Sequence, residues 1–73
     1  MNDELLKKLD LMIIDVKYSR GHDELEQNYN RTVEHLNIML KGNLIDKQKH
    51  ESLFTDLVEQ YGIALRRLES EKA

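Results

Sequence analysis

Apolar residues in the first third of the chain recur at helical spacing and occupy two sides of the expected helix. With about 100° of rotation per residue, one stripe is formed by Leu5, Leu6, Leu9, Met12, Ile13 and Val16. Leu11 and Ile14 project to roughly the opposite side. One stripe serves an internal core, whereas the second needs another covering, because small soluble proteins seldom leave such residues together in water. The pattern predicts an amphipathic helix with an additional surface for another polypeptide.

The remainder of the chain predicts two further helices. Apolar or small residues in the second segment fall at helical spacing at Leu25, Tyr29, Thr32, Leu36 and Leu40. In the third segment the steps are four, three, four and three residues, through Phe54, Val58, Tyr61, Leu65 and Leu68, and Leu53, Leu57 and Ala64 widen that stripe. We therefore expect helices over about residues 2–19, 23–41 and 46–69, of which the last is the longest.

Glycines and capping residues mark the expected ends of these helices. Proline is absent. We expect Gly21 to end the first helix, and Asp23 with Glu26 to form a capping box at the start of the second. Gly42 stands where a left-handed residue commonly ends a helix, and Asp46 is placed to cap the third helix.

This pattern predicts an all-α fold in a single domain over residues 1–73, either a small helical hairpin or a three-helix bundle with a long C-terminal amphipathic helix. In heptad notation, one core position of the third helix is occupied by Phe54, Tyr61 and Leu68 and the other by His50, Leu57 and Ala64, which would allow a short coiled-coil seam. A chain of 73 residues without cysteine has no disulfide to stabilise it. Helix packing alone must supply its stability.

Charge and hydropathy exclude several classes of partner. The 11 basic and 14 acidic residues give a net charge of -3 and are interleaved along the chain, whereas a nucleic-acid interface shows a basic patch. No apolar run approaches the roughly 18 residues of a membrane span, and Asp10 and Asp15 interrupt the first apolar segment. We expect no binding to nucleic acid, no membrane insertion and a cytoplasmic location.

Side chains that carry catalysis or bind metals do not form a recognisable arrangement. His22, His35 and His50 are not spaced three or four residues apart, as two metal ligands on one helical face would be. Acidic residues cluster at the expected helix start, where the helix dipole favours negative charge, and no serine or threonine stands in a glycine-framed turn. We expect no enzymatic activity, no catalytic residue, no cofactor and no metal.

Apolar residues outside the core stripes are the candidates for an interface with a partner. If the first two helices lie antiparallel, Leu11, Ile14 and Ile38 form one outer patch. The stripe of the third helix offers a second set of anchors, which comprises Phe54, Val58, Tyr61, Leu65 and Leu68. The partner is either another protein or a second copy of the chain in a homodimer. Alternatively, these residues lie at the boundary of a monomer's own core.

One family resembles this chain in its plan. The second helix ends in Leu40-Lys41-Gly42-Asn43, and the segment 44–50 (LIDKQKH) then leads into a long amphipathic helix. This order in a very short acidic chain resembles the small co-chaperones of type III secretion needle subunits. The resemblance implies a helical protein that joins a larger helical-repeat chaperone in the bacterial cytoplasm and keeps the needle subunit monomeric. The two-sided apolar character of the first helix departs from a plain hairpin.

Two functional interpretations follow for a non-enzymatic interaction module. In the first, the chain stabilises a larger chaperone through apolar helix contacts, as the resemblance implies. In the second, it is a small regulatory or inhibitory protein, of phage or chromosomal origin, that docks a helix on an enzyme or transcription factor. A DNA-associated dimer is disfavoured by the acidic balance.

Overall fold

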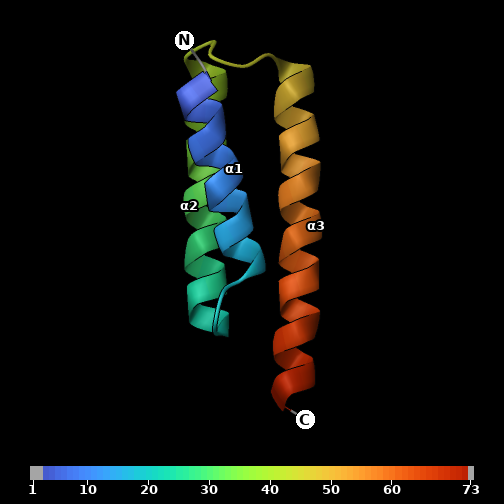
Figure 1. Ribbon diagram of the computed structural model, residues 1–73. Coiled ribbons are helices and arrows are strands. Elements are labelled where there is room, and N and C mark those ends of the chain that lie inside the picture. Colours follow the sequence, from blue (N-terminus) through green and yellow to red (C-terminus); the bar gives the residue numbers. More distant parts are fainter. Residues whose placement is uncertain (1–2, 73) are drawn as a thin grey trace.

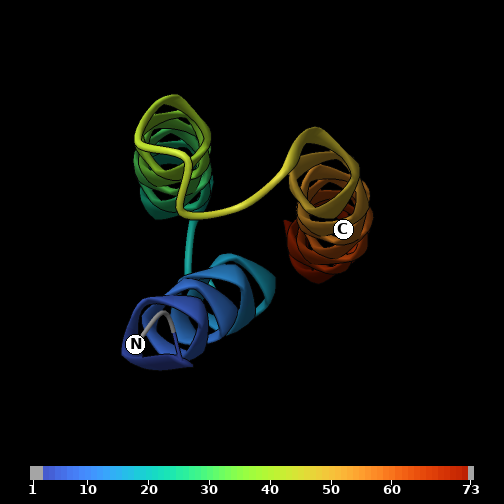
Figure 2. The same cartoon turned by 90° about the horizontal axis from the view of Figure 1, so that it is seen from above.

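The computed structural model describes residues 3–72 and confirms the all-α class. Three helices follow one another, α1 (Asp3–Lys17), α2 (His22–Lys41) and α3 (Lys47–Lys72), and no strand occurs within residues 3–72. α1 and α2 run antiparallel, and α3 returns in the direction of α1 (Figure 1). Seen from above, the helices occupy the corners of a triangle (Figure 2), and every pair of helices is in contact. The chain is therefore a three-helix bundle rather than a hairpin.

α3 determines the length of the molecule. It has 26 residues, and the molecule measures 44 × 18 × 16 Å, in keeping with a rise of about 1.5 Å per residue. The prediction of a long C-terminal helix is confirmed, although α3 continues to Lys72 rather than ending near residue 69. The predicted start of the first helix at residue 2 lies outside the described residues.

The connection between α1 and α2 differs from the predicted one. α1 ends at Lys17, and the buried Ser19 directs its hydroxyl toward the carbonyls of Asp15 and Val16, each at 3.0 Å. The N-cap of α2 is Gly21 in an extended conformation with no side-chain capping bond, so Gly21 belongs to the start of α2 rather than to the end of α1. The predicted capping box of Asp23 and Glu26 is wrong, because α2 already begins at His22 and places Asp23 inside its first turn.

The connection between α2 and α3 is held by a cap at each side. Asn43 donates to the Leu40 carbonyl at 3.1 Å and Leu44 to the Met39 carbonyl at 2.9 Å, which is the bonding pattern of a Schellman motif. The left-handed residue is Asn43, with φ of 58°, and not Gly42 as predicted. The prediction that Asp46 caps the third helix is confirmed by the 2.7 Å bond that its carboxylate accepts from the Lys49 amide.

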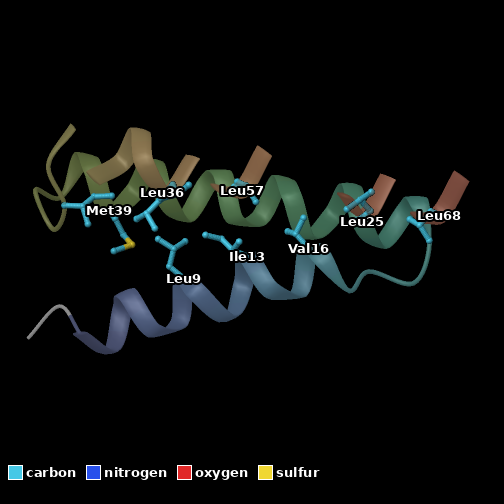
Figure 3. Packing of buried hydrophobic residues seen from close by; sticks show 11 residues of the cluster. Leu9, Ile13, Val16, Leu25, Leu36, Met39, Leu57 and Leu68 are labelled. Carbon is cyan, nitrogen blue, oxygen red and sulfur yellow. The ribbon is translucent and has the colours of Figure 1, made fainter. Parts of the chain in front are cut away.

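The core runs along the axis of the bundle between the three helices (Figure 3). Leu9, Ile13 and Val16 of α1 are buried there, which confirms these three members of the predicted inner stripe. Leu5 and Leu6 pack against the core, and Met12 is only half-buried. The other buried apolar residues are Leu25, Leu36 and Met39 of α2, Ile45 of the second connection, and Leu53, Leu57, Ala64 and Leu68 of α3. α1 therefore contributes only its inward stripe to the core. Leu11 and Ile14, on its other side, are exposed.

Candidate functional site

The outer surface of α1 carries three large apolar side chains at helical spacing. Leu11, Ile14 and Tyr18 are 62%, 47% and 62% exposed, and their positions i, i+3 and i+7 place them on one side of the helix. We call these three residues the outer stripe. Sequence reasoning identified Leu11 and Ile14 but missed Tyr18, although its spacing of seven residues from Leu11 was the available signal.

Tyr18 belongs to this stripe because the helical path continues one residue past the end of α1. Its amide donates to the Ile14 carbonyl at 3.1 Å, which is the i to i−4 bond of an α-helix. The ammonium of Lys17 lies 5.5 Å from the centroid of the Tyr18 ring, within the range of a cation–π interaction. The aromatic ring is thus placed in line with Leu11 and Ile14.

A side chain of α3 fixes this end of α1. Arg67 donates to the backbone carbonyl of Lys17 at 2.9 Å and also to that of Ser19. Carbonyls at a helix C-terminus lack intrahelical partners and attract positive charge, so Arg67 secures the segment that presents Tyr18. Sequence analysis gave Arg67 no such role, because a contact across 50 residues leaves no local pattern.

Charged residues flank the outer stripe on both sides. Asp10 and Lys17 lie toward α3, where they line a groove together with Ile14 of α1 and with Asp56 and Gln60 of α3.

Lys8 and Asp15 lie on the opposite flank, toward α2, as the helical rotation requires. The side-chain amide of Asn28 in α2 donates to the backbone carbonyl of Asp15 at 3.4 Å. Between Lys7 and Tyr18, each flank of α1 therefore carries one positive and one negative residue, and the exposed Glu4 adds a second negative charge on the flank of Lys8 and Asp15. Lys7 is exposed and lies in line with the stripe, four residues before Leu11.

The remaining predicted interface residues lie in two kinds of environment. Ile38 and Val58 are exposed. Leu68 is only 6% exposed and belongs to the core, and Phe54, Tyr61 and Leu65 are partly buried and pack against that core. The stripe predicted on the third helix therefore serves mainly the folding of this chain, because both other helices pack against it.

Ile38 is isolated on its own helix face, in contrast to the residues of the outer stripe. The residues three and four positions away are Glu34, His35, Lys41 and Gly42, and neither Glu34 nor Lys41 is buried. Ile38 thus has no large apolar neighbour along α2. Among the exposed large apolar residues of the described chain, only those of α1 form a stripe.

Polar side chains elsewhere form structural contacts. His50 stacks on Phe54 with ring centroids 6.1 Å apart, and its Nε2 lies 3.2 Å from the Asn37 Oδ1. This contact joins α3 to α2. Within residues 3–72, no three histidine or acidic side chains are grouped so that they could hold a metal ion.

Comparison with known proteins gives no relative from which a function could be transferred. No protein-family model, no curated protein and no solved structure matches this chain. In the described part of the chain, no helix combines the length and apolar character that crossing a membrane requires. The geometry of the surface must therefore carry any functional conclusion.

Proposed function

We propose that this chain is a non-enzymatic protein-interaction module that binds another polypeptide through the outer stripe of α1. The observation that carries the proposal is the exposure of Leu11, Ile14 and Tyr18 on a helix whose opposite side already fills the core. Exposed apolar groups at i, i+3 and i+7 are the anchors by which a helix docks on a protein surface. No requirement of the fold explains three of them on one face.

The energetics support a partner that covers all three anchors. Complete burial of a fully exposed large apolar side chain contributes about 1.5–3 kcal/mol, and the three side chains of the stripe are about half exposed. Association costs at least about 4 kcal/mol of lost translational and rotational freedom. One anchor does not offset this cost, so a partner must cover all three anchors and add contacts with the charged flanks. The charges around the stripe then select the partner and its orientation.

We further propose a co-chaperone role in the cytoplasm as the specific form of this function. The short acidic chain and its helix order resemble the co-chaperones of type III secretion needle subunits, and in such a role the outer stripe would stabilise a larger helical chaperone. Regulation of an enzyme or transcription factor would use the same stripe, so the identity of the bound protein separates these two roles.

The experiment compares capture by three tagged versions of the chain in the cells that produce it naturally. The wild type should retain its partner, and the variant with both Leu11→Ser and Ile14→Ser should lose it. Ile63→Ser is the matched control, because Ile63 of α3 is also exposed but has only polar or charged residues three and four positions away, namely Glu59, Gln60, Arg66 and Arg67. Equal recovery of every protein by the wild type and the double variant would refute the proposal.

A further inference from the structure

We infer that the partner of the outer stripe is the same stripe on a second copy of this chain, with the two α1 helices antiparallel. This inference rests on the proposed function and names the partner of the stripe in the isolated chain. A larger chaperone would bind the same stripe in competition with the second copy. The homodimer arrangement follows from the order of charges along the two flanks of the stripe and from the position of Lys7.

The flank charges of α1 are complementary to themselves in this arrangement. A two-fold axis midway between Leu11 and Ile14 brings each flank against the same flank of the other copy, with the direction reversed. At about 1.5 Å per residue, Lys8 then lies about 3 Å along the axis from Asp15 of the second copy, and vice versa. On the other flank, Asp10 and Lys17 meet with the same offset. Lys8, Asp10, Asp15 and Lys17 thus each face a residue of opposite sign, whereas Glu4 lies outside this set of pairs.

The apolar residues match in the same register. Leu11 lies level with Ile14 of the second copy, and Tyr18 lies level with Lys7. Each Lys7 thereby lies beside the Tyr18 ring of the other copy, which attracts a cation and which the Lys17 ammonium already approaches to 5.5 Å. A parallel pair would also oppose the flank charges, but it would bring the two Lys7 side chains together within the stripe, where like charges repel. The antiparallel arrangement is therefore the favoured one.

The outer stripe is accessible to a second copy without rearrangement of the bundle. α1 occupies one corner of the triangle (Figure 2), and Lys7, Lys8, Asp10 and Asp15 are all exposed. A stripe on one 15-residue helix is small beside the roughly 800 Å² per partner of a standard interface. We therefore expect a dimer that is weak and depends on protein concentration.

Sedimentation equilibrium of two charge-reversal variants, separately and mixed, tests this arrangement. Lys8→Glu and Asp15→Lys each place two like-charge pairs in the dimer, so each variant alone should dimerise about threefold to tenfold more weakly at low ionic strength. In an equimolar mixture, Glu at position 8 of one copy faces Lys at position 15 of the other, and Asp15 faces Lys8. The mixture should therefore regain the wild-type affinity to within about twofold.

The two variants serve as folding controls for each other, because the mixture contains the same two proteins that are measured alone. A chain that carries both reversals should also dimerise like the wild type if the helices are antiparallel. In a parallel pair it would dimerise more weakly than either single variant, because position 8 would then face Asp10 and position 15 would face Lys17, each with like charge. A wild type that stays monomeric up to about 1 mM, where even a millimolar Kd is detectable, would overturn the inference. A mixture no tighter than its components would do so too.

Failure of the homodimer can be distinguished from failure of the proposed interaction module. If the pure chain is monomeric but captures a different protein in a manner that requires Leu11 and Ile14, the homodimer is refuted and the interaction module stands. If the pure chain is monomeric and the double variant captures the same proteins as the wild type, both proposals fall.

Discussion

At the residue scale, the turn after α2 places its left-handed backbone conformation at Asn43 and an ordinary conformation at Gly42. Asn43 takes the left-handed conformation with φ of 58°, while Gly42 has φ of −82°, a value that any residue adopts. Asparagine tolerates the left-handed region better than most residues. The glycine in this turn is therefore not required by its backbone conformation.

This difference in backbone conformation predicts that alanine affects the free energy of unfolding differently at Asn43 and at Gly42. Asn43→Ala should lower the free energy of unfolding by about 1–2 kcal/mol, because an ordinary side chain is strained in the left-handed region. Gly42→Ala should leave it unchanged or raise it by up to about 1 kcal/mol, since an added Cβ meets the Ile38 carbonyl oxygen at 3.4 Å, an ordinary contact. Urea unfolding measures both. A larger loss at Gly42 than at Asn43 would contradict this account of the turn.

Sequence reasoning located this turn but assigned the left-handed residue to the wrong position. Glycine and asparagine both accept that conformation, so their composition alone does not decide between them. Asp46 was predictable, because its carboxylate caps the nearest free amides and requires no knowledge of the rest of the fold. The role of Gly21 as the N-cap of α2 was not predictable, since a glycine between two helices can end the first or begin the second.

At the element scale, α1 separates its apolar residues into a stripe for the core and a stripe at the surface. The helical period alone predicted this separation, and the burial of Leu9, Ile13 and Val16 against the exposure of Leu11 and Ile14 agrees with it. The burial of the apolar residues of α3 was less predictable, because α1 and α2 both pack against this helix. Tyr61, for example, lies against Tyr29 of α2 with ring centroids 4.7 Å apart, which sequence spacing does not reveal.

The separation within α1 predicts that its two stripes differ in their effect on stability. Replacing both Leu11 and Ile14 with serine should change the free energy of unfolding by no more than about 1 kcal/mol, as is usual for surface positions. Leu57→Ala, at a fully buried position of α3, should cost about 2–5 kcal/mol.

Urea unfolding followed by circular dichroism, at a protein concentration low enough to prevent association, provides this comparison. If the double variant loses as much stability as Leu57→Ala, the outer stripe contributes to the fold, and its role as a docking surface loses its basis.

At the scale of the whole molecule, the bundle both builds the core and presents α1 at one corner. The contact of Arg67 with the end of α1 depends on the return of α3 alongside α1, so only the assembled fold brings it about. The sequence predicted the helices, their order and most of the core. It could not place Ile38 relative to Leu11 and Ile14, because the relative rotation of two helices is decided by packing.

Site-specific photo-crosslinking shows whether the outer stripe of α1 binds a polypeptide in the cell. A photoreactive amino acid replaces Tyr18 in one protein and the exposed Glu34 of α2 in a control, and both are irradiated in the cells that produce the chain. A polypeptide bound to the outer stripe should give a discrete crosslinked protein from position 18 and none from position 34, and that protein is a second copy of the chain if the homodimer forms. No crosslink at position 18, or identical products from both positions, would contradict binding through the outer stripe.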